Sequence, residues 1–306
     1  MTPAEQPQAP TRFGLLVRVG IFLLVVRVAF WLLGGALHWV GGLLLAGTVA
    51  SFLAGLLANS VAMRVYERAS VAAAGLGWSP ASPRHLLEGT GAGLLAGALA
   101  VGGLLAAGGR LVPASDPAAY FAPGKLAFVS VLLLFGAAGE ELMFRGYGFQ
   151  LLLALWGSWA IAPISILFAA LHAWNPGSGV LSLVNTALWG FVLGYAVYRT
   201  GDLWLATGIH FGWNLALPIA GANLSGFTIG LSGRQLEVSQ LPALWSGGAY
   251  GPEASLFTTA VAAVAALFIH FRGYRLQPAL LLARYGRRGA AAAAGGAGEG
   301  PAAQAH

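Results

Sequence analysis

Residues 136–150 read GAAGEELMFRGYGFQ and place two adjacent carboxylates, Glu140 and Glu141, and one arginine, Arg145, in an otherwise apolar run. The chain has only 10 acidic residues in 306, so such a pair is unusual. Charged residues make up 8% of the chain, hydrophobic residues 58%, and the mean hydropathy is +0.74. Soluble domains carry roughly 25% charged residues. The composition therefore predicts an integral membrane protein.

Apolar stretches long enough to cross a hydrocarbon core of ~30 Å recur along the chain. They predict an all-α polytopic membrane protein with about eight transmembrane helices and a polar cavity inside the membrane. The fourth stretch is too long for a simple span, so we expect tilt or protrusion to absorb the excess. The expected helices cover 14–34, 38–58, 86–109, 125–156, 159–174, 180–199, 203–221 and 254–272.

The chain divides into a disordered cytoplasmic N-terminus at 1–13, one transmembrane domain at 14–272, and a basic, then low-complexity tail at 273–306. The arginines gather on one side of the predicted topology, which places both termini in the cytoplasm. This distribution explains the net charge of +6 without a nucleic-acid partner. The many Ala, Gly and Arg residues indicate a GC-rich prokaryote, hence its cytoplasmic membrane. The lack of cysteine excludes disulfides, thiolate metal sites and a cysteine nucleophile.

The paired carboxylates differ in their helical neighbours. Ionisable groups inside a bilayer cost about 2.5–3.5 kcal/mol and usually mark functional sites. Glu141 and Arg145 are four residues apart, so their side chains meet and neutralise each other. Glu140 is rotated by about 100° from Glu141 and lacks that partner. We expect a structural Glu141–Arg145 pair and a Glu140 that is free for chemistry; the alternative is that both glutamates are solvated at the interface.

His172 ends the fifth apolar stretch, in ILFAALHAWNP. If the chain turns at 156–159, Glu140 lies ~24 Å and His172 ~20 Å from that turn at 1.5 Å per residue. Antiparallel neighbouring helices would therefore bring the two side chains to a similar level. A lone histidine at a helix end is otherwise an interfacial anchor.

His210 and Asn214 are four residues apart in ATGIHFGWNLA and share one helix face. Gly208 and Gly212 are expected to leave room beside them. Measured from a turn near Gly201, His210 is shallower than His172 by roughly 7 Å. The alternative role of His210 and Asn214 is interhelical hydrogen bonding.

A carboxylate, two histidines and an amide suit hydrolysis by an activated water molecule. Glu140 would take the proton of the water as general base, and His172 would hold the water or share the proton. His210 and Asn214 would donate hydrogen bonds to the oxyanion of a tetrahedral intermediate, a contribution of ~3 kcal/mol per donor in other enzymes. This set requires no metal or other cofactor.

Three motifs occur in order on separate predicted helices. EELMFR matches EExxxR, FAALH matches FxxxH from Phe168 to His172, and HFGWN matches HxxxN. Together they resemble the type II CAAX prenyl endopeptidases and the wider CPBP (Abi) family of membrane proteases, over residues 125–221.

The resemblance implies a glutamate-dependent intramembrane endopeptidase. It makes Glu140 the base, His172 its partner, and His210 with Asn214 the oxyanion hole. Glu141, Arg145 and Phe168 would support them. It also implies a membrane-bound peptide or lipidated protein as substrate, prenylated CAAX proteins being the substrates of eukaryotic and some archaeal members.

Three other functions fit parts of the pattern. His172, His210 and Glu140 could form a catalytic zinc site, although no H-E-x-x-H motif is present. A serine protease could use the GLSG sequence at 230–233 with His270. A scaffold, immunity protein or transporter would use the polar cluster for packing or an ion path; the paired broken helices of transporters are not evident.

Overall fold

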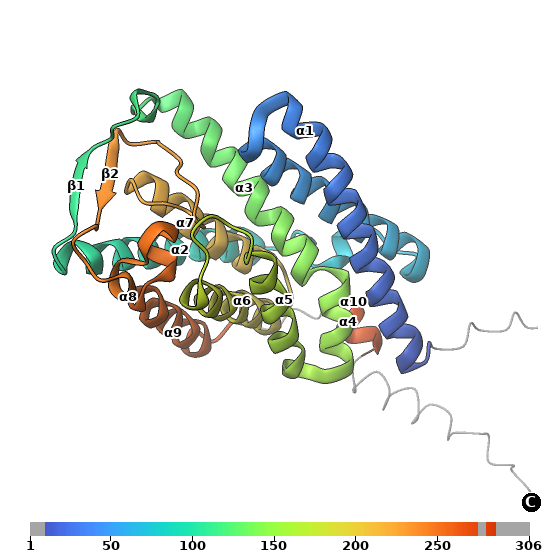
Figure 1. The fold of residues 1–306 in the computed structure, drawn as a ribbon. Helices are drawn as coiled ribbons and strands as arrows, with labels where there is room; N and C mark the ends of the chain where they lie inside the picture. Colours follow the sequence, from blue (N-terminus) through green and yellow to red (C-terminus); the bar gives the residue numbers. More distant parts are fainter. Residues whose placement is uncertain (1–9, 275–279, 286–306) are drawn as a thin grey trace, which may run out of the picture.

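The computed structural model describes residues 10–274 and 280–285 (Figure 1). Most of the segment predicted to be disordered at 1–13, and the low-complexity end of the tail, lie outside the described residues. Helices dominate the fold. One short antiparallel sheet pairs β1 (Arg110–Pro113) with β2 (Arg234–Glu237) and joins two connecting segments for which the sequence predicts only loops.

Each of the eight predicted apolar segments contains a helix, with shifted bounds. The main helices are α1 (Arg12–Ala62), α2 (Ser82–Ala106), α3 (Pro123–Arg145), α4 (Tyr147–Trp156), α5 (Ile161–Leu171), α6 (Val180–Thr200), α7 (Trp204–Ile219) and α9 (Leu256–Phe271). The shorter elements are α8 (Ala243–Ser246), α10 (Leu280–Tyr285), a π-helical turn at Met63–Glu67 and 3₁₀ turns at Val71–Ala74, Pro117–Ala119, Gly157–Ala160, Gly248–Tyr250 and Pro252–Ala254.

Four helical segments in the described part of the chain are long and apolar enough to cross a membrane: Arg12–Glu67, Ser82–Ala106, Pro123–Leu171 and Val180–Thr200. They support an all-α integral membrane protein. Two of the four contain internal breaks, and α7 and α9 have only 16 residues each. The number of transmembrane crossings, about eight, stays a prediction.

The α1 element is a helical hairpin rather than one rod. Gly41 and Gly42 leave the helical conformation, and Gly42 has a φ of 73°, which favours glycine. A Cβ atom on Gly34 would lie 3.8 Å from the Cβ of Ala50, a contact that requires the chain to fold back. The two limbs, 12–40 and 43–62, correspond to the predicted helices 14–34 and 38–58, but the reversal comes later than predicted.

The long fourth helix predicted at 125–156 is broken at Gly146, where ψ is −142°. The break leaves backbone groups of two helices without their usual partners, and Asn59 of α1 satisfies them. Its Nδ2 donates to the carbonyl of Leu142 at 2.9 Å, and its Oδ1 accepts from the Tyr147 N–H at 2.7 Å. The predicted long helix is therefore two helices, α3 and α4, and its expected tilt or protrusion stays a prediction.

Helices α2 and α7 touch backbone to backbone. A Cβ atom added at Gly89, Gly93, Gly208 or Gly212 would overlap backbone atoms of the opposite helix. Small residues at such spacing allow close helix packing in membranes. Gly208 and Gly212 thus face α2, and the expectation that they leave room beside His210 is wrong. The level of α7 is set by α2.

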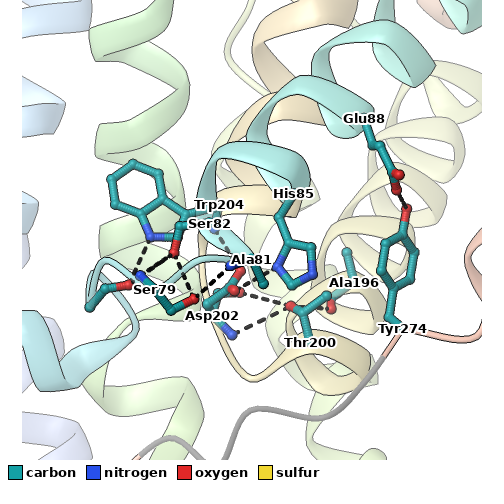
Figure 2. A network of polar contacts seen from close by, with 11 residues as sticks. Ser79, Ala81, Ser82, His85, Glu88, Ala196, Thr200, Asp202, Trp204 and Tyr274 are labelled. Carbon is teal, nitrogen blue, oxygen red and sulfur yellow. Dashed lines mark hydrogen bonds and ion pairs between the residues drawn. The ribbon is translucent and has the colours of Figure 1, made fainter.

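A buried polar network fixes the start of α2 to the turn between α6 and α7 (Figure 2). The Nδ1 of His85 lies 2.7 Å from Oδ2 of Asp202, and both residues are buried. Oδ1 of Asp202 accepts from the Trp204 N–H at 3.0 Å, and the hydroxyl of Thr200 donates to the Asp202 carbonyl at 3.1 Å. This network holds the first turn of α7 and is not apparent from the sequence.

Part of the predicted tail is ordered and packs on the domain as α10. Arg284 donates to Oε2 of Glu67 at 2.7 Å, and the Tyr285 hydroxyl donates to the same oxygen at 2.9 Å. Glu67 also accepts from the Tyr147 hydroxyl at 3.0 Å. The domain boundary at residue 273 stays a prediction, and α10 lies beyond it in the sequence.

The contact between α2 and α7 predicts opposite effects for two neighbouring glycines of α2. Gly93→Ala should destabilise the protein by about 1–3 kcal/mol, because its methyl group overlaps the α7 backbone. Gly91 has nothing within 4 Å of an added Cβ, so Gly91→Ala should be neutral or stabilising by up to ~1 kcal/mol. Thermal unfolding in detergent measures both. Equal losses at the two positions would show that α2 and α7 are not in backbone contact.

Candidate active site

A cavity of about 1200 Å³ lies between α1, α3, α5, α6 and α7 and the segment that precedes α9. Its wall is mostly apolar. Glu140, His172, His210 and Asn214 all line it. The four residues that the sequence singles out for chemistry therefore come from three helices to one space.

A buried chain of charges stands behind this wall. Glu141 and Arg145 are both 0% exposed, and Nη1 of Arg145 lies 3.3 Å from Oε1 of Glu141. The same oxygen lies 2.9 Å from Nδ1 of His210. The other guanidinium arm donates to the carbonyl of Gly190 at 3.1 Å. Helices α3, α6 and α7 are thus joined through one buried Glu141–Arg145 pair.

Phe168 packs among these groups. The Arg145 guanidinium lies 4.6 Å from the centre of its ring, a cation–π contact. The ring centres of His172 and His210 lie 4.7 and 6.2 Å from that of Phe168. A single aromatic ring therefore separates the arginine from the cavity and sets the spacing of the two imidazoles.

Glu140 lies in a different environment from its neighbour. Its side chain is 29% exposed, and Oε2 lies 3.7 Å from Nε2 of His210. That distance permits an ion pair but not a hydrogen bond. The same oxygen is buried and has no hydrogen-bond donor among the described residues. Glu141 is therefore paired with Arg145 and His210, whereas Glu140 lines the cavity.

The imidazoles are held differently. The Nδ1 of His172 is 2.8 Å from the carbonyl of Phe168; a carbonyl only accepts, so Nδ1 carries the hydrogen and Nε2 is left available. The imidazole beside Glu140 is that of His210, whereas the sequence predicts His172 there. Asn214 makes no side-chain hydrogen bond with any described residue and retains its amide donors.

Glu253 is a cavity residue that the sequence pattern does not reveal. It lies in the 3₁₀ turn Pro252–Ala254, between α7 and α9. Its Oε1 accepts from the indole N–H of Trp213 at 3.0 Å, and its Oε2 accepts from the backbone N–H of Ser225. Burial raises the pKa of Glu253 above its usual value, and these donors oppose that shift in part.

Asn185 of α6 anchors this turn. Its Nδ2 donates to the carbonyls of Glu253 and Ser255 at 2.8 and 2.9 Å, and Thr259 donates to its Oδ1 at 2.7 Å. The only sign of this role in the sequence is that Asn185 is a single amide side chain in an apolar helix. Its partners lie about 70 residues away, so sequence spacing could not identify them.

The two residues of the serine-protease alternative, Ser232 and His270, do not hydrogen-bond to each other. The hydroxyl of Ser232 accepts from the Arg234 N–H at 3.4 Å, whereas His270 pairs with the Tyr195 hydroxyl at 2.8 Å. For the zinc alternative, no group of three or more His, Asp or Glu residues close enough to hold a metal ion occurs in residues 10–274 and 280–285.

Residues 122–216 match the family model described as Type II CAAX prenyl endopeptidase Rce1-like. The match covers less than half of the chain, runs from α3 into α7, and includes all three motifs. Arg27 of α1 and Glu253 lie outside it. No curated protein matches the chain.

Glu253 predicts a pH-dependent term in stability. Folding raises the pKa of Glu253. The contribution of Glu253 to the free energy of unfolding is therefore greatest below the pKa that it has in the unfolded chain, and it is lost as pH rises through the pKa that it has in the folded protein. The advantage of the native protein over Glu253→Gln should therefore shrink from pH 4 toward neutrality. Each ~1 kcal/mol lost lowers the melting temperature by roughly 2–4 °C.

The measurement is thermal unfolding in detergent across this pH range. Glu237→Gln is the matched control, because Glu237 is an exposed glutamate of β2. An advantage that stays constant or grows with pH would contradict a raised pKa of Glu253.

Proposed function

On the premise that residues 122–216 form an Rce1-like type II CAAX prenyl endopeptidase domain, we propose that the protein cleaves a peptide bond of a membrane-associated substrate with water activated by Glu140. The family match supports a membrane endopeptidase in general. The observation that carries the mechanism is the unequal use of the two adjacent glutamates. Glu141 neutralises Arg145, while Glu140 lines the cavity with a side chain that is 29% exposed.

Glu140 acts as the general base. A base must lie within reach of the proton that it removes, and Glu141 is buried behind the cavity wall with Arg145 and His210. The carboxylate of Glu140 takes a proton from water, and the water oxygen attacks the carbonyl carbon of the substrate. The negative charge passes to the carbonyl oxygen.

His210 and Asn214 stabilise that oxyanion. Nδ1 of His210 is committed to Glu141, so Nε2 is the nitrogen that faces the cavity. The protonated ring donates through Nε2, with two carboxylates beside it to balance its charge. Asn214 lies one turn further along α7 and donates through its amide. Each such donor is worth ~3 kcal/mol in other enzymes.

His172 assists the proton transfers. The hydrogen bond to Phe168 fixes its ring and leaves Nε2 available. This nitrogen holds the water before attack. The proton taken by Glu140 is then delivered to the nitrogen of the leaving amine, directly or through His172, and the C–N bond breaks. Water is consumed, and both protein groups return to their starting states.

The apolar wall supports a lipidated or membrane-bound substrate. Leu23, Phe30, Leu133, Leu167 and Leu171 line the cavity beside the polar groups. A prenyl chain of a CAAX-type protein would be buried favourably there, at about 25 cal/mol per Å² of apolar surface. We further propose a location in a prokaryotic cytoplasmic membrane, with both termini cytoplasmic.

Glu140→Gln tests the base. The variant should fold like the native protein, because the replaced carboxylate accepts no hydrogen bond from the described residues. Hydrolysis of a fluorogenic CAAX-type peptide should fall by at least ~100-fold, the lower end for a general base. Glu237→Gln is the control. In parallel, peptide profiles of membrane fractions should show uncleaved precursors. Full turnover by a folded Glu140→Gln protein would refute the mechanism.

Metal dependence is tested separately. Incubation with a zinc chelator should leave hydrolysis of the same peptide unchanged, since water activation is assigned to Glu140 alone. Loss of hydrolysis that added zinc restores would instead establish a zinc protease. If the native and Glu140→Gln proteins both lack hydrolysis but retain the same biological effect, the protein is a scaffold.

A further inference from the structure

Arg27 is a charged residue of the cavity that neither the motifs nor the family match includes. It lies in the limb 12–40 of α1, within the apolar sequence GIFLLVVRVAFWLL. Among the described residues that line the cavity, it is the sole arginine or lysine. Its side chain is exposed and forms no ion pair or hydrogen bond with any described residue.

Helix register brings Arg27 near the level of Glu140. The limb 43–62 runs parallel to α3, because Gly136 packs on Thr48 and Asn59 bonds to Leu142. The limb 12–40 is therefore antiparallel to α3.

Gly34 of this limb faces Ala50, and Ala50 lies between Thr48 and Phe52, which face Gly136 and Gly139 of α3. From that common level, Arg27 is seven residues back along α1, about 10.5 Å, and Glu140 is two to three residues along α3, about 4 Å, toward the same end. The two Cα atoms therefore differ in level by ~7 Å, about the length of an extended arginine side chain.

The depth of Arg27 disfavours a lipid phosphate as its partner. Arg27 lies about 22 Å from one end of the limb 12–40 and about 20 Å from the other. For a bilayer centred on this limb, a hydrocarbon core of ~30 Å places Arg27 near its middle, beyond the reach of either headgroup layer. An unpaired cation there costs about 2.5–3.5 kcal/mol, which an anion brought into the cavity would offset.

We propose that Arg27 binds a carboxylate of the peptide substrate and thereby positions the scissile bond at Glu140. The proposal rests on the proposed function. A guanidinium binds a carboxylate through two parallel hydrogen bonds, and Glu140 and Glu253 repel a carboxylate elsewhere in the same cavity. The carboxylate belongs to the C-terminus of the peptide or to an aspartate or glutamate side chain.

Three fluorescent farnesylated CAAX peptides separate these two sources. One ends in a free carboxylate, the second is its C-terminal amide, and the third is the amide with aspartate as its last residue. Binding is measured by anisotropy in the Glu140→Gln protein, which does not consume the peptides. Arg27→Gln and Arg27→Lys are added to this background. Arg110→Gln is the charge-matched control, since Arg110 is exposed on β1.

The acid should bind about 10–100-fold more tightly than the amide, the range of a charge-assisted hydrogen-bonded pair. Arg27→Gln should reduce this ratio to about one, Arg27→Lys should give an intermediate ratio because it lacks the planar fork, and Arg110→Gln should preserve it. If only the aspartate peptide binds more tightly than the plain amide, and Arg27→Gln abolishes that difference, Arg27 binds a side-chain carboxylate of the substrate.

Equal binding of all three peptides to protein that retains Arg27 would overturn the proposal, and this comparison needs no variant at position 27. A preference for the acid that survives in Arg27→Gln would also overturn it. If the native protein binds the acid selectively but hydrolyses none of the peptides, the carboxylate site stands and the proposed endopeptidase function falls.

Discussion

The site depends on the need to neutralise one buried cation, Arg145. Its guanidinium is completely removed from solvent, and an uncompensated buried charge costs about 3–5 kcal/mol. Glu141 supplies the countercharge, the Gly190 carbonyl accepts from the second arm, and Phe168 covers one face. These partners lie on α3, α6 and α5, so satisfying the arginine brings three helices together. The carboxylate that neutralises it also binds His210 and so adds α7.

The roles of the adjacent glutamates follow from this constraint. On one helix, Glu141 can point toward Arg145 only if Glu140 points about 100° away, and on α3 that direction is the cavity. The position of His210 requires a second constraint, because α7 must sit at the right level. Backbone contact with α2 and the His85–Asp202 pair fix that level. A residue without a side chain, such as Gly93, thus contributes to the geometry of the site through α2.

The sequence predicts what depends on neighbours along the chain. The four-residue spacing of Glu141 and Arg145, the apolar segments and the order of the motifs are of this kind. It does not predict what depends on distant partners. The break at Gly146 is stabilised by Asn59, and the turn that carries Glu253 is held by Asn185. The estimate of the level of His210 counts residues from its own turn, whereas the backbone contact of α7 with α2 fixes that level in the fold. The functional roles of the cavity residues stay predictions.

An apolar cavity makes its few charges effective over long distances. Interactions between charges are screened within about 8–10 Å in physiological salt, but buried pairs are screened much less. Glu140 and Glu253 therefore place negative potential on the walls formed by α3 and the turn before α9, and Arg27 places positive potential on the α1 wall. A peptide with a single carboxylate has one favourable direction in such a field. Its apolar part remains free to fill the rest of the cavity, where the side chains impose shape but no charge. On the proposed function, the orientation of the peptide depends on the arginine of α1, whereas the burial of a lipid chain depends only on the apolar side chains of the cavity.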